Sequence, residues 1–272
     1  MDNILYVVGT PIGNMGDMTP RAVETLESVD FIAAEDTRVT LKLLNHFHIK
    51  KPMVSYFEHN KHDHGVKIIE RILAGESCAI VTDAGMPCIS DPGEDLIRRC
   101  EAAGIRTVVV PGPSAVISAL AVSGLETGRF TFEGFLSVNK KSRQEHLESL
   151  INERRTMIFY EAPHKLPNTL ADLYATFGDR RLTIARELTK LHEEIIRTTL
   201  KEAQKYIDEP LKGELVLILE GRKDEEKSII TPEEAVAYAK KLIEGGMRPT
   251  DAAKEAAAMA GLKKNDIYKQ LM

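Results

Sequence analysis

The chain has 272 residues, with 36 lysines and arginines against 41 aspartates and glutamates, and a formal net charge of −5. This length exceeds the usual domain size of roughly 100 to 150 residues, so we expect more than one domain and, as the first expectation, an enzyme. Hydrophobic residues make up 43% and charged residues 28%, values that exclude a disordered, collagenous or coiled-coil chain.

The sequence offers no segment for a membrane or for export. Its longest apolar run, residues 115–122, is far shorter than the roughly 20 residues of a bilayer-spanning helix. Met1-Asp2-Asn3 leads into an apolar run without the basic region and cleavage site of a secretory signal. Cys78, Cys88 and Cys100 are too few and too irregularly spaced for a disulfide framework or a four-ligand zinc site. We expect a cytoplasmic protein that meets any nucleic acid through a local basic patch.

The first 124 residues alternate strand and helix patterns. The apolar runs are residues 4–8, 31–34, 78–82 and 107–110, and the helical patterns between them include residues 21–28, 41–47 and 65–73. Helix starts are indicated by Thr19-Pro20, Asp91-Pro92 and Pro113-Ser114. This order predicts an N-terminal α/β domain, residues 1–124, with a mostly parallel sheet.

The pattern changes after Gly124. Strands are predicted at residues 131–136, 157–160, 182–186, 194–199 and 214–219. Two of them follow each other without a helix, which indicates antiparallel pairing and a second α/β domain, residues 125–221, with a mixed sheet. A charged linker, residues 221–228, precedes a helical module, residues 229–272. Its last helices meet at Gly261, as a helix-turn-helix or as a simple helical cap.

A glycine-rich loop follows the first strand, Gly9-Thr10-Pro11-Ile12-Gly13-Asn14-Met15-Gly16. Such a loop lets the backbone approach a ligand at the edge of a doubly wound sheet. Its spacing departs from the dinucleotide fingerprint, and Pro11 removes a backbone N–H that a pyrophosphate would need. The loop therefore predicts a ligand other than NAD, or a structural tight turn.

Two further strand ends carry chemistry-bearing residues. Ala34-Glu35-Asp36-Thr37-Arg38 has a carboxylate pair for gripping a ribose, for capping a helix beside an arginine, or for substrate chemistry. Thr82-Asp83-Ala84-Gly85-Met86-Pro87-Cys88-Ile89-Ser90-Asp91-Pro92-Gly93 is the strongest local signal, and Val110-Pro111-Gly112-Pro113-Ser114-Ala115 repeats the strand-loop-helix order. These loops converge on one edge of the sheet, where open α/β sheets bind ligands.

Two other features favour neither a reactive thiol nor a metal site. Cys88 has no adjacent histidine that would activate it, so a bystander thiol is the favoured interpretation. His59, His62 and His64 cluster, but without a paired ligand pattern they do not favour a metal site.

Taken together, these loops resemble the tetrapyrrole methylase superfamily and, within it, the branch that methylates small-subunit ribosomal RNA. The matching motifs are Gly9-Thr10-Pro11-Ile12-Gly13-Asn14, Ala34-Glu35-Asp36-Thr37-Arg38, Asp83-Ala84-Gly85-Met86-Pro87, Ile89-Ser90-Asp91-Pro92-Gly93, Pro111-Gly112-Pro113-Ser114-Ala115, Phe132-Glu133-Gly134-Phe135-Leu136, Tyr160-Glu161-Ala162-Pro163-His164 and Ala185-Arg186-Glu187-Leu188-Thr189-Lys190. Ser137 stands where the resemblance leads us to expect proline, which affects a local turn.

The resemblance implies a two-domain α/β fold that binds S-adenosylmethionine between its domains, needs no metal and forms a homodimer. It implies 2′-O-methylation of a decoding-site cytidine of 16S rRNA within the small ribosomal subunit. The expected cofactor-binding residues are Pro11, Gly13, Asp83, Ala84, Gly85, Pro87, Ser114, Ala115, Arg186 and Leu188. A carboxylate is expected as general base, either Glu35 or Asp36, oriented by Arg38.

Cations for RNA phosphates are expected at Lys140, Lys141, Arg143, Lys190, Lys263 and Lys264. Glu145, Glu148 and Glu153 dilute the first of these groups, so a solvated helix face stays an alternative. Three rival functions also remain: a small-molecule tetrapyrrole methyltransferase on the same fold, a non-catalytic nucleic-acid-binding regulator, and an NAD-dependent oxidoreductase.

Overall fold

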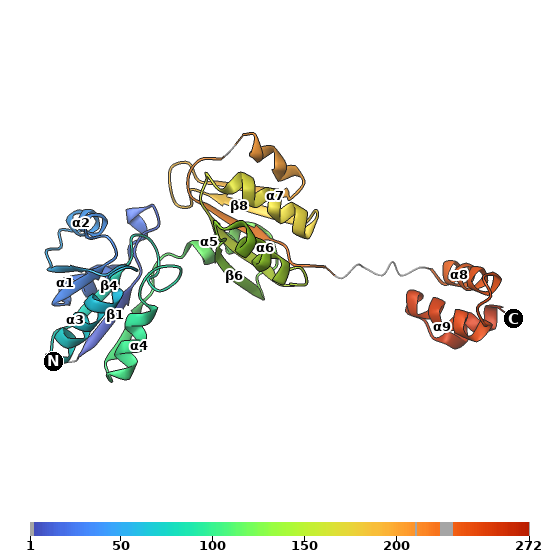
Figure 1. Ribbon diagram of the computed structural model, residues 1–272, viewed down its shortest axis with the longest axis horizontal. Coiled ribbons are helices and arrows are strands. Elements are labelled where there is room, and N and C mark those ends of the chain that lie inside the picture. Colours follow the sequence, from blue (N-terminus) through green and yellow to red (C-terminus); the bar gives the residue numbers. More distant parts are fainter. Residues whose placement is uncertain (1–2, 210, 224–230, 272) are drawn as a thin grey trace. The chain divides into compact units, whose positions relative to one another are not determined.

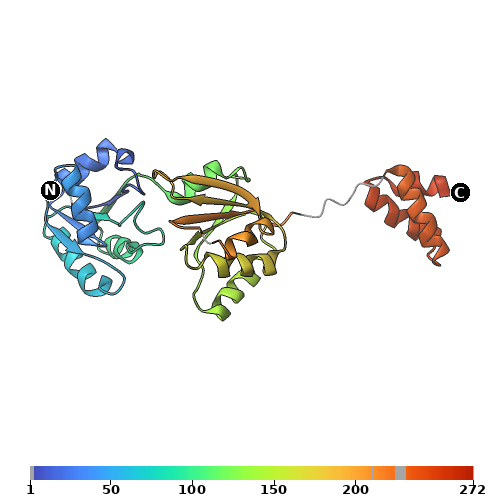
Figure 2. The same cartoon turned by 90° about the horizontal axis from the view of Figure 1, so that it is seen from above.

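The computed structural model describes residues 3–209, 211–223 and 231–271. The chain divides into two compact units, residues 1–221 and residues 222–272. The larger unit holds two five-stranded sheets, each with helices packed on both faces (Figures 1 and 2). The predicted fold class, two α/β sheet domains with a C-terminal helical module, is confirmed.

The first sheet is entirely parallel and has the order β3-β2-β4-β1-β5. Its strands are β1 (Ile4–Val8), β2 (Phe31–Ala34), β3 (Met53–Ser55), β4 (Cys78–Val81) and β5 (Arg106–Val110). The central strands β2 and β4 are buried along their whole length, as expected for parallel strands covered on both faces. The order reverses between β1 and β4, so the carboxyl ends of these two strands form the topological switch point.

Four helices cover this sheet. They are α1 (Pro20–Ser28), α2 (Thr37–His46), α3 (Lys61–Leu73) and α4 (Glu94–Ala102), and a short 3₁₀ helix, η1 (Met15–Asp17), follows the first loop. One core cluster packs Leu26 and Leu44 of α1 and α2 against the sheet, and another packs Ile72 and Leu96 of α3 and α4. The two helix pairs therefore lie on opposite faces.

The second sheet is mixed and has the order β6-β7-β10-β8-β9. Its strands are β6 (Phe130–Phe135), β7 (Thr156–Glu161), β8 (Arg181–Arg186), β9 (Glu194–Thr199) and β10 (Leu215–Leu219). β6 and β7 pair in parallel, and the remaining pairs are antiparallel, including the β8–β9 hairpin. One face is covered by α6 (Lys140–Ser149), α7 (Leu166–Phe177) and the 3₁₀ helix η2 (Glu202–Ile207). The other face is covered by α5 (Ala115–Ser123).

The position of α5 differs from the expected division at residue 124. Val116 and Leu120 of this helix pack in one core cluster with Ile158 and Val216 of the second sheet. The Ser123 carbonyl oxygen also accepts a hydrogen bond from the Thr183 hydroxyl of β8 at 2.9 Å. The chain therefore passes from one half to the other at Pro111-Gly112-Pro113-Ser114, before α5 and not after it.

The smaller unit contains three helices, α8 (Pro232–Glu244), α9 (Pro249–Ala260) and α10 (Lys264–Leu271). Thr231 and Glu234 form the capping box at the start of α8. Alanines from α8 and α9 make up most of the core around Ile267, and Gly261 ends α9 in the left-handed conformation. Residues 224–228 of the predicted linker, and 229, 230 and 272 of the predicted module, lie outside the described residues.

None of the helices in the described ranges is long and apolar enough to cross a bilayer.

Candidate functional site

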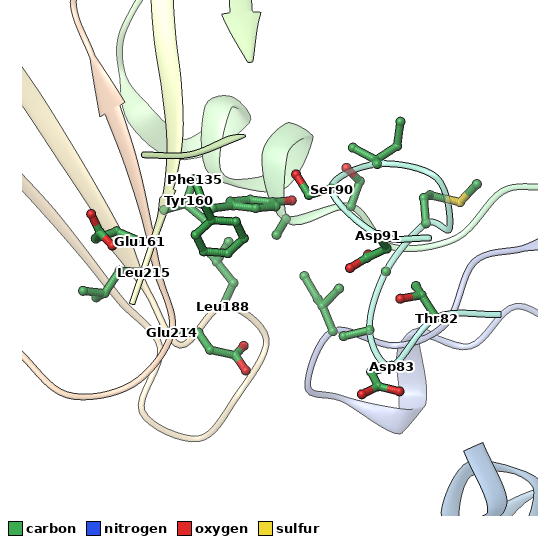
Figure 3. Close-up of a pocket in the computed structure, with 18 of the residues that line it drawn as sticks. Thr82, Asp83, Ser90, Asp91, Phe135, Tyr160, Glu161, Leu188, Glu214 and Leu215 are labelled. Carbon is green, nitrogen blue, oxygen red and sulfur yellow. The ribbon is translucent and has the colours of Figure 1, made fainter. Parts of the chain in front are cut away.

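A cavity of about 460 Å³ lies between the two halves of the larger unit (Figure 3). Its volume falls in the range of roughly 300 to 1,000 Å³ that is usual for small-molecule sites. The first half lines it with Ile12, Glu35, Thr82, Asp83, Ala84, Gly85, Met86, Ile89, Ser90 and Asp91. The rest of the chain adds Ser114, Ala115, Phe135, Tyr160, Glu161, Ala162, Pro163, Ala185, Leu188, Glu214, Leu215 and Val216.

The glycine loops are packed backbone against backbone at the switch point. Thr10 and Gly85 exchange two backbone hydrogen bonds of 2.9 and 3.1 Å, which joins the loops that follow β1 and β4. A Cβ atom on Gly9 would lie 2.7 Å from the Gly112 Cα, so only glycine permits the third loop to cross there. The three loops therefore form one rigid floor for the cavity.

The loop after Gly85 holds a strained backbone. Cys88 and Ser90 have positive φ angles of 71° and 66°, although neither is glycine. Such conformations cost about 1 to 3 kcal/mol each and persist where the surrounding structure imposes them. Gly93, and not Asp91, is the N-cap residue of α4, so the Asp91 side chain is not used to cap the helix that the sequence suggested. In Figure 3, Ser90 and Asp91 face Phe135 and Tyr160 across the cavity.

Three carboxylates meet at the carboxyl ends of β2 and β4. Glu35 Oε2 accepts hydrogen bonds from the Thr82 hydroxyl at 2.5 Å and from the Asp83 amide at 3.3 Å. Burial, and then the nearby Glu35 charge, raise the pKa of Asp83 and raise the pKa of Asp91 to about 6. Asp83 and Asp91 therefore bind protons more readily than an ordinary aspartate does.

Asp36 and Arg38 form an arrangement of their own. Asp36 caps α2 by accepting a 2.8 Å hydrogen bond from the Arg38 amide, and its other oxygen lies 2.6 Å from the Arg38 guanidinium. These hydrogen bonds lower the pKa of Asp36 to about 2. Neither residue lines the cavity, whereas Glu35 does. The geometry therefore matches the helix-cap and ion-pair alternative for Asp36 and Arg38.

Aromatic side chains form the opposite wall. The Tyr160 ring contacts Phe132 edge-on at 5.0 Å and Phe135 at 5.4 Å between centroids. Phe135 is 55% exposed although it lines the cavity, so its ring offers a free apolar face. Beside it, the buried Glu161 accepts hydrogen bonds from the Ala162 amide and from the Thr169 hydroxyl, which fixes the turn after β7.

Six of the ten expected cofactor-binding residues line the cavity: Asp83, Ala84, Gly85, Ser114, Ala115 and Leu188. Pro11 and Pro87 are buried and do not line it. Gly13 faces Lys190, whose Cγ atom would lie 2.5 Å from a Cβ at that position. Arg186 donates a 2.6 Å hydrogen bond to the Lys212 carbonyl oxygen and pairs with Glu194, so its side chain braces a loop of the second half.

The expected RNA-binding cations differ in how freely they are held. Lys140 is exposed, and Lys141 is exposed with Glu145 3.8 Å away. Arg143 pairs with Asp172 at 2.7 Å and is mostly buried. Lys190 contacts both Glu187 and Glu214 at 3.0 Å, on the loop that meets Gly13. Lys263 and Lys264 are exposed on the smaller unit.

Several lining residues were not singled out from the sequence. Phe135, Tyr160 and Ala185 lie within the matching motifs but had no assigned role, and Asp91 was expected only to start a helix. Glu214, Leu215 and Val216 carried no motif, and only their place at the start of a strand could have indicated them. The histidine cluster has structural contacts, such as His64 with the Ser55 carbonyl oxygen, and no metal-ligand group occurs among the residues described.

The sequence profile of the tetrapyrrole (corrin/porphyrin) methylases matches residues 4–204 of the chain. The structure is similar to that of a uroporphyrin-III-C-methyltransferase from Thermus thermophilus, with a TM-score of 0.58, 19% identity, and coverage of 80% of this chain and 94% of that one. The structural likeness concerns the fold alone, but the profile match spans most of the chain. The chain therefore belongs to the tetrapyrrole methylase family.

Within that family, full-length relatives are more similar. A Synechocystis protein is 48% identical over 97% of this chain and 96% of its own length, and a Bacillus subtilis protein is 43% identical over 97% of this chain and 92% of its own. Both bear the name ribosomal RNA small subunit methyltransferase I, as does a Haemophilus influenzae protein that is 43% identical. The particular group to which the chain belongs is thus the ribosomal RNA small subunit methyltransferase I group.

Proposed function

We propose that this protein transfers a methyl group from S-adenosylmethionine to the ribose 2′-hydroxyl of a decoding-site cytidine of 16S rRNA, within the small ribosomal subunit. The name shared by its full-length relatives supports a ribosomal RNA substrate. The ribose position, the cytidine and the decoding site come from the motif resemblance and belong to the proposal.

The charge of the cavity is the observation that carries the cofactor assignment. Five lining residues are carboxylates, and no lysine or arginine lines the cavity in the described part of the chain. The carboxylates are Glu35, Asp83, Asp91, Glu161 and Glu214. S-adenosylmethionine is cationic at its sulfonium and amino groups, so this field attracts it, whereas the pyrophosphate of NAD would be repelled. The same charge disfavours the oxidoreductase alternative.

The chain has residues suited to holding this cofactor. The backbone around Ala84 and Ala115 offers polar groups without bulky side chains, and Leu188 and Val216 supply apolar contacts. When bound, S-adenosylmethionine supplies an electrophilic methyl group on a good leaving sulfur. The protein then has to align the acceptor oxygen with that methyl group and exclude water, which needs no metal ion.

A nucleotide acceptor fits the opposite wall. A base that is drawn out of an RNA stack needs an aromatic surface to replace its lost stacking, and Phe135 offers an exposed ring inside the cavity. The exposed Lys140, Lys141, Lys263 and Lys264 are proposed to contact phosphates. Arg143 and Lys190 are held by ion pairs, so any role in RNA binding is proposed to act through the loops that they brace.

The proposal also includes the expected catalytic residues, the oligomeric state and the location in the cell. We propose that Glu35, which lines the cavity, belongs to the catalytic group, and that Asp36 with Arg38 supports it by fixing the start of α2. A homodimer that acts in the cytoplasm is proposed on the family resemblance.

Two measurements test the proposal. Calorimetry with S-adenosylmethionine, S-adenosylhomocysteine and NAD should give binding for the first two only. Small subunits from a strain that lacks this gene should then accept a methyl group on a ribose oxygen, while uroporphyrinogen III should not. Methylation of the porphyrinogen without methylation of the subunit would favour the small-molecule alternative instead.

A further inference from the structure

We propose that Asp91 is the catalytic base of this reaction: its carboxylate, beside Glu35 and Thr82, takes the proton of the acceptor hydroxyl. The inference rests on the proposed function and adds a residue that the sequence analysis expected only to start a helix. It follows from where each carboxylate of the cavity is placed and what each already binds.

The loop geometry presents Asp91 to the cavity. The residue lines the cavity and lies directly after Ser90, one of the two non-glycine residues with positive φ in this loop. Gly93 caps α4, so the Asp91 carboxylate has no capping hydrogen bond to make. Figure 3 shows it between Thr82 and the aromatic wall, whereas the Asp83 carboxylate points away from the two rings.

The other carboxylates of the cavity are already engaged. Glu161 is bound by the Ala162 amide and Thr169, and Glu214 pairs with Lys190. Asp83 accepts a 3.1 Å hydrogen bond from the Asp36 amide. Outside the cavity, Asp36 is bound by Arg38. Each of these groups has a hydrogen-bond donor that competes with a substrate proton.

The hydrogen bond of the Thr82 hydroxyl distinguishes Glu35 from Asp91. This hydroxyl lies within hydrogen-bonding reach of both carboxylates, but it has a single proton, which it donates to Glu35 at 2.5 Å. Glu35 also accepts from the Asp83 amide. Glu35 therefore holds two protein hydrogen bonds, both on Oε2, whereas in the described part of the chain the Asp91 carboxylate is within reach of the Thr82 hydroxyl alone and is the more open of the two to a substrate hydroxyl.

The surroundings of Asp91 make it basic. The charged or titratable groups around it are Glu35 on the β2–α2 loop, Asp83 at the end of β4, Cys88 in its own loop and Tyr160 on β7. None of these neighbours is a cation, and burial with the Glu35 charge raises the pKa of Asp91 to about 6. A base with a pKa just below neutrality is ionised at pH 7 and still accepts a proton, whereas Asp36, with a pKa of about 2, is a weak base.

The step balances in atoms and electrons. The 2′-oxygen forms a bond to the methyl carbon, the bonding pair of the carbon–sulfur bond stays on sulfur, and the hydroxyl proton passes to Asp91. The sulfonium becomes a neutral thioether, and the carboxylate becomes a neutral acid. Asp91 later returns its proton to solvent, which its pKa of about 6 permits at pH 7.

The test compares the full-length wild type with Asp91→Asn, Glu35→Gln and the control Asp95→Asn. Asp95 is a carboxylate four residues away that pairs with Arg99 and does not line the cavity. Single-turnover transfer to small subunits from the gene-deletion strain is measured between pH 5 and 9, with the methylated position mapped on the RNA. Calorimetry in buffers of different ionisation enthalpy gives S-adenosylmethionine affinity and the protons released on binding.

We expect Asp91→Asn to lower the transfer rate by a factor of about 10² to 10⁴, the usual contribution of a general base, while cofactor affinity changes by less than about tenfold. The wild-type rate should rise with pH to a plateau above about 6, and Asp91→Asn should lose that inflection together with the proton release near pH 6. Glu35→Gln should shift the inflection to lower pH, because the charge that raises the pKa of Asp91 is gone. Asp95→Asn should behave as the wild type.

The outcomes separate the two proposals. If the wild type methylates a ribose oxygen and Asp91→Asn stays within threefold of its rate, Asp91 is not the base, although the proposed function stands. The same conclusion follows if the wild-type profile shows no inflection between pH 5 and 7. If the wild type methylates no ribose oxygen in the subunit, the proposed function fails and the assignment of Asp91 fails with it.

Discussion

Replacing Asp91 with asparagine should stabilise the protein at neutral and alkaline pH. The pKa of Asp91 rises from 3.8 to about 6 on folding, because burial and the Glu35 charge disfavour its ionised form. The folded state therefore holds this proton more tightly than the unfolded state, and stability falls as pH rises from about 4 to about 6. Asparagine has a similar shape and no charge, so the variant avoids this loss.

The size of this stabilisation follows from the pKa shift of Asp91. About two pKa units correspond to about 3 kcal/mol, and because the side chain is only partly buried, solvent screening reduces this by about half. We expect Asp91→Asn to be about 1.5 kcal/mol more stable than the wild type at pH 8 and equally stable near pH 4. For a unit of this size the gain corresponds to a rise in melting temperature of about 3 to 6 °C at pH 8.

Thermal unfolding of both proteins from pH 4 to pH 8, followed by circular dichroism, measures this difference. The reasoning is refuted if the variant is less stable than the wild type at pH 8, or if the difference between them does not depend on pH. A stabilised variant that has lost activity would also show that the inactivity does not come from misfolding.

Four other predictions concern separate parts of the molecule. Gly9→Ala should lower the free energy of unfolding by about 3 kcal/mol, because its Cβ would lie 2.7 Å from the Gly112 backbone, and it should weaken S-adenosylmethionine binding in calorimetry. The control is Gly128→Ala, which has open space around it and should change the free energy of unfolding by no more than about 0.5 kcal/mol. Phe135→Ala should raise the KM for small subunits by about tenfold, since base stacking contributes roughly 1 to 3 kcal/mol. Its cofactor affinity should stay within about threefold of the wild type, and Phe135→Tyr should keep the wild-type KM. An unchanged KM in Phe135→Ala would contradict the stacking role. Truncation after Gly221 should leave S-adenosylmethionine binding intact and weaken binding to the subunit in sedimentation assays, whereas lost cofactor binding in a folded core would place the helical module in the active site. Raising salt from 50 to 200 mM should weaken subunit binding only modestly, because the chain has 36 basic against 41 acidic residues and a net charge of −5. A loss above about 10³ would indicate a strong electrostatic footprint instead.

The parallel half of the fold could be predicted because most of its strands are short apolar runs, and because β1, β4 and β5 end in glycine loops. β4 is such a run and was expected over residues 78–82, while β3 was not anticipated, since its three residues are only half-buried and do not alternate. The boundary near α5 was misplaced because a uniformly apolar helix gives no sign of which sheet it covers.

The candidate site was predictable where backbone geometry demands particular residues, as at Gly9 and Gly85. It was not predictable where a role depends on the neighbours of a side chain. Asp91 precedes a proline and was interpreted as a helix start, but Gly93 takes the capping position and leaves the carboxylate in the cavity. Val216 is an ordinary strand residue in the sequence, and only the order of the second sheet brings it to the cavity.

The proposed reaction is tested most directly by mapping the methyl group that this protein adds. Small subunits from a strain that lacks the gene are incubated with the purified protein and S-adenosylmethionine, and the 16S rRNA is digested and analysed by mass spectrometry. We expect one added methyl group, on the ribose of a decoding-site cytidine, and none when that nucleotide lacks its 2′-hydroxyl. A methyl group on a base, or continued methylation of the 2′-deoxy nucleotide, would contradict it.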